Sequence, residues 1–450
     1  MKRLKRGVRG VRHMMNRGTT WLARARRALL TPMDPAIAGQ TGRNINYLCS
    51  EVVWAAMLST AAAFNATYAL RLGASNKMIT WLSSLPALIA MLVLIPAARF
   101  LESRSNRISW LWASLFAARL GYGLLAFLPW LISSHRAEAT IWLLIAIQIP
   151  ANFFAAGFNP LLADVIPERD RIWVFARRNI LASAVVVVLT FLAGQWLELS
   201  GRFRWFTFPV NFQLLYMLGF VGSIVSSSIL LKIKVPPSEV PTSAPSGESS
   251  KPRAAGIRNM FRVNRDFAVI IFNTLIFNAG AWLVGPLYII FFIRELGASD
   301  AWVGLNTTVA NAAVIVGHML WRRWIRALGN RRALTIAAPL GACYAFLVSL
   351  FPNLTAILAW GACVNLIDPG INLSHFNILL KLAPDDHRTS YLAMFSTVMN
   401  VGAFILPMLG LALANILGIR TVLLIGGGIR LVGAILFYVH PARVQETEIR

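Results

Sequence analysis

Long apolar runs separated by short polar stretches dominate the hydrophobic pattern of this chain. A helix needs ~20 mostly apolar residues to cross a bilayer, and the sequence holds twelve runs suited to that role. We therefore expect an all-α membrane protein with twelve transmembrane helices in two pseudosymmetric six-helix halves. The predicted spans are Asn46–Leu72, Met78–Ala98, Ser109–Ser133, Ala139–Ala163, Asn179–Glu198, Val210–Leu231, Phe267–Ile293, Ala301–Ile325, Ala333–Phe351, Leu354–Leu382, Thr389–Asn415 and Thr421–His440.

Two segments half a chain apart share one pattern, which indicates the two halves. Residues 158–171 and 376–388 each carry Phe-Asn and Leu-Leu on an apolar stretch, followed by Pro, acidic residues and Arg. Between the halves lies a stretch rich in Pro and Ser, which is typical of a flexible linker. The expected units are a basic cytoplasmic arm at 1–45, a six-helix half at 46–232, a cytoplasmic linker at 233–265, a second half at 266–440 and a cytoplasmic tail at 441–450.

Composition supports the membrane class. Of 450 residues, 57% are hydrophobic and only 14% charged, and the mean hydropathy is +0.62, which is too apolar for a soluble protein of this length. The net charge of +25 would suit nucleic acid, but the cations are concentrated in loops on one side of the predicted spans. That asymmetry is the positive-inside pattern. It predicts a multi-pass protein of the cell inner (plasma) membrane with both termini cytoplasmic.

Residues 1–33 carry many Arg and Lys and no acid. One interpretation is an amphipathic helix on the inner leaflet, where the arginines bind anionic lipid. The other is a disordered tail that only helps to orient the protein. No secretory signal is predicted, because no apolar segment of the usual kind follows the basic run.

The whole layout resembles the major facilitator superfamily of secondary transporters, over essentially residues 46–440. The loop from Trp321 to Arg332 is similar to the glycine-led loop signature of that family, and the loop after the second span resembles it more weakly. The resemblance implies charge pairs that latch the cytoplasmic face, with Glu102, Arg107, Arg326 and Arg331 as the gate. The acid of the signature is kept as Glu102 but falls on Arg326 in the second half, where the charge is reversed.

In the eleventh span, Gly402, Pro407 and Gly410 resemble part of the glycine-proline signature that antiporters of the family carry in the fifth span. The competing interpretation is an ordinary kinked helix, since Gly and Pro are common in membrane spans.

Polar residues inside spans are the candidates for function, because polar groups in hydrocarbon need a partner or a wet cavity. The tenth span is the richest. Asn365, Asp368, Asn372 and His375 are three, four and three residues apart, which places them on one helix face. Pro369 follows Asp368 and removes a backbone donor, so the helix is expected to kink or break there.

Two roles compete for Asp368. Its carboxylate can cap a half-helix that begins at Pro369. Alternatively it is a proton-coupling site, because removal of a carboxylate from water favours its neutral form. Glu51 is the second candidate for proton coupling, although it can also snorkel to the membrane interface.

Other spans of the expected central cavity add further polar residues. In the resembled family the first, fourth, seventh and tenth spans line that cavity. The predicted substrate-binding set is therefore Asn65, Tyr68, Gln148, Asn152, Asn273, Asn278, Asn365, Asp368 and Asn372. The alternative for any single asparagine is a hydrogen bond between packed helices, worth ~0.6–2 kcal/mol.

Two arginines lie at the centre of predicted spans, Arg119 in the third and Arg430 in the twelfth. An isolated arginine there costs at least ~2.5 kcal/mol, so each should have a partner. Structural pairing is the favoured interpretation. An anionic substrate becomes plausible for whichever of them faces the cavity.

The sequence favours a secondary active transporter that moves a small molecule by alternating access, with proton-coupled export of an amphipathic compound ahead of uptake of a polar solute such as a sugar. The other class is a non-transporting receptor or scaffold with the same fold. We predict no enzyme, no cofactor and no metal, since nucleotide-loop, zinc-spacing and nucleophile-base motifs are missing from the sequence. The expected partners are the substrate, a proton and anionic lipid, with no nucleic acid, and the protein is expected to be a monomer.

Overall fold

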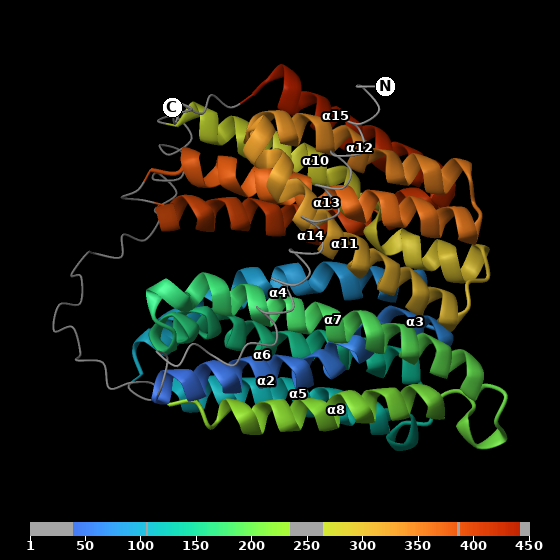
Figure 1. The fold of residues 1–450 in the computed structure, drawn as a ribbon. Helices are drawn as coiled ribbons and strands as arrows, with labels where there is room; N and C mark the ends of the chain where they lie inside the picture. Colours follow the sequence, from blue (N-terminus) through green and yellow to red (C-terminus); the bar gives the residue numbers. More distant parts are fainter. Residues whose placement is uncertain (1–38, 105–106, 235–263, 385–387, 442–450) are drawn as a thin grey trace, which may run out of the picture.

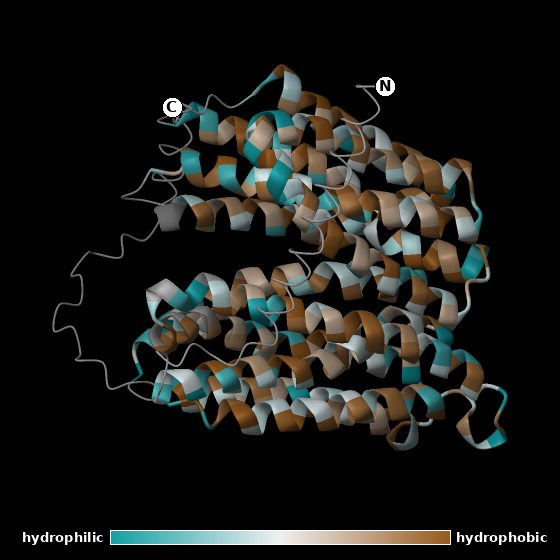
Figure 2. Ribbon diagram, viewed as in Figure 1, coloured by the Kyte–Doolittle hydropathy of each residue, from teal (hydrophilic) through white to brown (hydrophobic). Residues whose placement is uncertain are grey.

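The computed structural model describes residues 39–104, 107–234, 264–384 and 388–441. Twelve segments of this part of the chain are helical, long and apolar enough to span a membrane. Most of the basic arm, most of the linker and the tail beyond residue 441 lie outside the described residues, and α2 begins at Gln40, within the predicted arm. Apolar residues cover the middle of the helices, and hydrophilic ones gather toward their ends (Figure 2). The expected twelve-helix membrane fold is confirmed.

The first half contains spans one to six. Its helices are α2 (Gln40–Ala62), α3 (Asn65–Arg71), α4 (Asn76–Glu102), α5 (Arg107–Leu131), α6 (Arg136–Val165), α7 (Glu168–Ser200) and α8 (Val210–Leu230), with a short 3-10 helix η2 (Arg204–Phe206) before α8. Together α2 and α3 make the first span, and a turn at Ala63 and Phe64 separates them.

The second half contains spans seven to twelve. Its helices are α10 (Arg265–Ile290), α11 (Asp300–Leu328), α12 (Asn330–Leu350), α13 (Leu354–Leu382), α14 (Arg388–Leu417) and α15 (Ile419–Val439), with a π-helical turn η3 (Phe291–Glu295) that extends α10.

Local signals explain where several spans begin. The side chains of Ser75 and Ser299 accept hydrogen bonds from backbone N–H groups in the first turns of α4 and α11, at 3.3 and 3.2 Å. These are equivalent helices of the two halves, and each uses the same type of N-cap. Gly329 separates α11 from α12 with a φ of 80°, a conformation that favours glycine.

The two halves repeat one packing scheme. In the first, α2 packs on α7 and α8, and α6 packs on α4 and α5. In the second, α10 packs on α14 and α15, and α13 packs on α11 and α12. Figure 1 shows the halves as two layers of roughly parallel helices, the first half blue to green and the second yellow to red. The pseudosymmetry predicted from the repeated sequence pattern is thereby confirmed.

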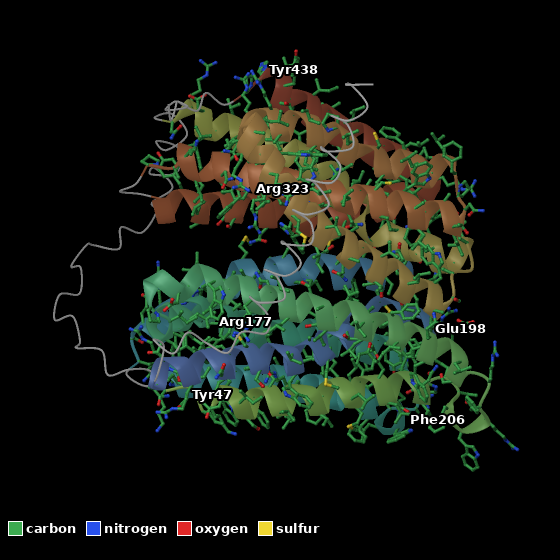
Figure 3. The ribbon with its side chains drawn as sticks, in the orientation of Figure 1. Tyr47, Arg177, Glu198, Phe206, Arg323 and Tyr438 are labelled. Atoms are coloured by element: carbon green, nitrogen blue, oxygen red, sulfur yellow. The ribbon has the colours of Figure 1, made fainter. Side chains whose placement is uncertain are left out.

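We call the end of the bundle where α8 stops and α10 starts the linker end, and the other end the distal end. Tyr47 on α2 and Phe206 in the loop after α7 lie at these opposite ends of the first half (Figure 3). The halves meet through α7 with α11 and through α4 with α14.

The contacts between the halves concentrate at the distal end. Gly194 of α7 and Gly304 of α11 touch so closely that a Cβ added to Gly304 would lie 2.7 Å from the Cα of Gly194. A hydrophobic cluster joins the first turns of α4, around Met78 and Leu82, to the last turns of α14, around Leu411 and Ala414. The bundle is therefore tied together at the distal end.

Two details of the helices differ from the prediction. The tenth span does not break: α13 is continuous from Leu354 to Leu382, with Pro369 inside it. Asp368 is therefore a mid-helix residue, and the interpretation of it as a cap is wrong. The fifth span starts at Glu168 rather than at Asn179, which places Arg178 inside the helix.

Candidate functional site

One face of α13 carries Asn365, Asp368, Asn372 and His375, and we call it the polar stripe. Trp321 and two glycines fix its position. Trp321 of α11 is buried, and its Nε1 donates to the Leu366 carbonyl of α13 at 3.1 Å. A Cβ on Gly370 would overlap the Trp321 ring, and one on Gly317 would overlap the Leu366 carbonyl. Glycine at both positions lets α11 and α13 approach closely. This contact holds the turn that carries Asp368.

A cavity of about 560 Å³ opens beside the stripe, within the second half of the chain. Its walls come from α10, α13, α14 and α15 and combine polar with aromatic side chains. The lining residues are Thr274, Phe277, Asn278, Asp368, Ile371, Asn372, Leu373, His375, Phe376, Phe395, Met399, Arg430 and Phe437.

The stripe supplies three polar groups to this cavity. Asp368 is half-buried, and its Oδ2 accepts a hydrogen bond from Nδ2 of Asn372 at 2.5 Å. His375 lies one turn further on, with its Nε2 2.7 Å from Oγ1 of Thr274 on α10. The Thr274 hydroxyl also lies 2.7 Å from the Ile270 carbonyl, to which it donates, and a His375 ring with its proton on Nε2 would complete this arrangement by donating to Thr274.

Arg430 of α15 lines the same cavity. A Cβ on Gly280 of α10 would overlap the backbone of Arg430 and of Gly426, so α10 and α15 cross there at minimal distance. The guanidinium carbon lies 4.6 Å from the centroid of the Phe277 ring, a cation–π arrangement. The Nε atom is buried and has no hydrogen-bond partner in the described structure.

Asn278 and Asn365 lie near the stripe in different settings. Asn278 lines the cavity and approaches Sδ of Met399 at 3.9 Å. Asn365 bonds back to the Gly361 carbonyl of its own helix at 2.8 Å.

Asn273 lies elsewhere in the second half. It is buried and donates to the carbonyls of Leu436 and His440, at 3.3 and 2.9 Å, and so secures the end of α15.

The candidates on the first span lie away from this cavity. The Asn65 amide donates to the Tyr122 hydroxyl at 3.3 Å, and its carbonyl accepts from Tyr216 at 3.0 Å. Tyr68 is fully buried and stacks on Phe212 at 5.2 Å. These residues form an aromatic cluster inside the first half, a placement that favours a packing role.

Glu51 is the centre of a buried ion cluster near the linker end of the first half. Its carboxylate lies 3.2 Å from Arg178 and 3.6 Å from Arg119, and it accepts from the Ser226 hydroxyl at 2.7 Å. Arg119 also donates to the Ser223 carbonyl at 2.6 Å. The side chain of Glu51 is buried, so it does not snorkel to the interface.

This cluster confirms a structural pairing for Arg119. It also explains Arg178, which sequence reasoning missed because the span was predicted to start after it. The exposed fractions of Glu51, Arg119 and Arg178 are 5%, 4% and 8%. A buried carboxylate that is paired with two guanidinium groups has its charge compensated within the protein.

The remaining pair of candidates is on α6. Gln148 and Asn152 are half-buried, and the Asn152 amide donates to the Gln148 carbonyl of the same helix at 2.8 Å. The cavity beside Asp368 does not include them.

The predicted gate residues Glu102, Arg107, Arg326 and Arg331 are exposed at the linker end. Arg326 donates to the Arg322 carbonyl at 3.2 Å. In the described ranges, these four residues form no ion pair across the halves. Arg331 instead lines a second cavity, of about 750 Å³, beside the loop between α11 and α12.

The glycines of the eleventh span are contact points. A Cβ on Gly402 would lie 2.7 Å from the Trp282 ring of α10, and one on Gly410 would overlap the Leu283 carbonyl. Close packing against α10 accounts for both.

Comparison with known proteins agrees with this architecture. Residues 270–449 match the family model described as Major Facilitator Superfamily. The second half of the chain therefore resembles this superfamily. A search of the curated proteins finds no match.

Solved transporters share the fold over nearly their whole length. A bacterial homologue of the human lysosomal transporter Spinster, inward-facing and unoccupied, gives a TM-score of 0.64 at 13% identity over 88% of this chain and 96% of that one. The nucleoside transporter NupG gives 0.61 at 13% over 88% and 98%. The E. coli fucose:proton symporter FucP gives 0.57 at 14% over 90% and 100%. The names of the last two proteins refer to a nucleoside and to fucose, and at 13–14% identity the likeness establishes the fold and leaves the substrate to the site itself.

Proposed function

We propose that the protein is a secondary active transporter that moves a small amphipathic molecule across the membrane by alternating access, with Asp368 as the proton carrier. The observation that carries the proposal is a carboxylate at mid-span of α13, inside a cavity of small-molecule size. An ionisable residue inside the membrane is energetically costly, and such residues mark functional sites.

The arrangement of the halves supports alternating access. Distal contacts close one end, and among the described residues the exposed gate side chains at the linker end form no ion pair between the halves. If the linker is cytoplasmic, as the basic loops indicate, this is an inward-facing state. Rocking of one half on the other then exposes the cavity to the opposite side.

The surroundings of Asp368 support its exchange of a proton. His318 on α11 and Arg430 on α15 interact with it electrostatically, and Asn372 bonds to it from its own helix. The Asn372 amide stabilises the ionised form, whereas burial favours the neutral one. Glu51 is a weaker carrier, because Arg119 and Arg178 already neutralise it.

The direction of transport has less support. The aromatic side chains beside Asp368 favour export of an amphipathic compound. Gly402 and Gly410 of α14 pack against α10 and so give no separate support for export.

The test uses the full chain in liposomes that contain a pH-sensitive dye, with a panel of dyes, organic acids and sugars added outside. A transported compound should cause a proton flux in the wild type that an uncoupler abolishes. Asp368→Asn should lose that flux, whereas the matched control Glu138→Gln, an exposed carboxylate of α6, should keep it.

Two results would contradict the proposal. Full proton coupling in Asp368→Asn removes this residue from the mechanism. A lack of flux of every compound in the wild type favours the receptor or scaffold interpretation.

A further inference from the structure

Arg430 places a guanidinium group at the wall of the cavity without a protein anion bound to it. In the described structure, no carboxylate forms a salt bridge with Arg430, and its Nε is buried without a partner. The nearby Phe277 ring contributes only its π face. A cation in this position is expensive unless something else neutralises it.

In the first half, the buried arginines have a structural role, and their charged and polar partners can be compared with those of Arg430. Arg119 and Arg178 each reach the Glu51 carboxylate, and serine hydroxyls and backbone carbonyls take up further N–H groups of the two. That cluster is buried, and none of its residues lines the cavity. Arg430 differs in both respects, which points to a partner that is not part of the protein.

Asp368 does not serve as that partner. Its charge attracts Arg430, and both residues line the cavity, but the two side chains form no salt bridge. The Oδ2 atom of Asp368 is instead taken by Asn372. The cavity thus holds one positive and one negative group that stand apart.

The rest of the wall is apolar and aromatic. Phe376 on α13, Phe395 on α14 and Phe437 on α15 contribute rings, and Met399 contributes a polarizable thioether. A volume of about 560 Å³ is in the range of small-molecule sites. Such a wall suits a ring or a branched hydrocarbon that carries a single charged group.

We propose that the substrate is an amphipathic organic anion whose carboxylate binds Arg430 and whose apolar body lies against the aromatic wall. The proposal rests on the transport function proposed above and specifies its substrate class. A guanidinium fork matches a carboxylate in geometry and charge, and the low dielectric of the cavity strengthens the pair.

Asp368 then acts on the anion through its charge. An ionised Asp368 repels a carboxylate at Arg430, and its protonation removes that repulsion. By linkage, the proton and the organic anion bind more tightly together than separately. They move in the same direction, so the charge arrangement favours proton symport.

The experiment measures binding of 2-naphthoate and of its neutral analogue 2-naphthamide to the purified full-length protein in detergent, by calorimetry and by ligand-induced thermal stabilisation. The wild type should bind naphthoate at least ~10-fold more tightly than naphthamide, the size expected for a charge-assisted contact. In Arg430→Gln this preference should disappear while naphthamide binding stays the same.

Two further variants complete the test. Arg323→Gln is the charge-matched control and should keep the preference, since Arg323 (labelled in Figure 3) is exposed on α11 and is not among the residues that line the cavity. Asp368→Asn should bind naphthoate several-fold more tightly, because a competing negative charge is gone. It remains informative even if Arg430→Gln fails to fold.

Equal binding of the two compounds, no binding of either, a preference that survives Arg430→Gln, or weaker naphthoate binding in Asp368→Asn would each overturn the substrate class. None of these results affects the liposome test of proton-coupled transport. If one of these binding results is found and another compound of the panel still causes a proton flux in liposomes, the proposed transport function stands and only the organic-anion substrate is rejected.

Discussion

Arg71, the last residue of α3, forms a salt bridge with Asp300, the first residue of α11, with Nη2 and Oδ1 3.2 Å apart. The same guanidinium donates to the Ala298 carbonyl at 3.1 Å. In the reverse direction, Arg294 of the second half donates to the Ala74 carbonyl of the first at 2.5 Å. These reciprocal contacts join the halves at the distal end, where an alternating-access mechanism needs a closure that can open.

Removal of the ion pair should shift the protein toward opening of the distal end. Arg71 is 37% exposed, and pairs of this kind contribute ~0.2–1 kcal/mol, so Arg71→Gln should raise the distally open population by up to ~5-fold. Distances between spin labels on α3 and α11 measure that population. Arg136→Gln is the matched control, because Arg136 bonds only within its own half, to the Ile132 carbonyl; an equal shift in the control would show that the pair is not a closure contact.

Gly304 should be a steric limit on the same closure. A Cβ there would lie 2.7 Å from the Cα of Gly194 and 3.0 Å from the Thr190 carbonyl oxygen, both backbone atoms. Gly304→Val should therefore separate α7 from α11 and disfavour the distally closed state, seen as faster alkylation from the distal side of a cysteine placed at Asn372. Gly285→Val serves as the control, because a Cβ at Gly285 meets nothing within 4 Å. Unchanged alkylation in Gly304→Val contradicts the assigned contact.

Glu51 should be important for stability. Glu51→Gln leaves Arg119 and Arg178 buried without a counter-charge, and breaking one partner of a buried ion cluster costs about 3–5 kcal/mol. Unfolding in detergent should show this loss, whereas Glu102→Gln at an exposed site should change stability by less than ~0.5 kcal/mol. A loss of proton coupling in Glu51→Gln with full stability would instead return Glu51 to the mechanism.

The contact between Trp321 and Gly370 should show strong coupling between two helices. Gly370→Ala forces a methyl group into the Trp321 ring and should cost about 1–3 kcal/mol of unfolding free energy. Trp321→Phe removes the hydrogen bond to Leu366, worth about 1 kcal/mol. Trp321→Leu should make Gly370→Ala less harmful, which a double-mutant cycle detects. Additive effects of the two changes would mean that the ring and the glycine do not limit each other.

Much of the fold could be predicted, because the membrane spans and the two halves depend on local stretches of the sequence. The twelve spans follow from length and hydropathy, and the pseudosymmetry follows from the repeated loops. The break in the first span at Ala63 carries no Pro or Gly to announce it. α13 also continues through Pro369, next to a contact with α11 in which Trp321 donates to the Leu366 carbonyl, and the local sequence around the proline does not show this contact.

The site was predictable only in part, for a similar reason. The spacing of Asp368, Asn372 and His375 gives their common face directly. Whether a polar residue faces a cavity or a neighbouring helix depends on helix rotation and on partners far away in sequence. Asn65 between two tyrosines shows this, and so does Arg430, whose place follows from the approach of α10 at Gly280.

The most direct test of the central claim is the side from which one cavity residue can be reached. In a variant that lacks Cys49, Cys343 and Cys363 and carries Asn372→Cys, we would add an impermeant reagent from each side of oriented vesicles and measure alkylation at position 372 by peptide mass spectrometry. Addition of Arg71→Cys and Asp300→Cys, joined by a reducible cross-linker before the alkylation, fixes the distal end closed. We predict reaction from both sides without the cross-link, reaction from the linker side alone with it, and recovery after reduction. Reaction from one side only, whether or not the cross-link is present, would contradict alternating access.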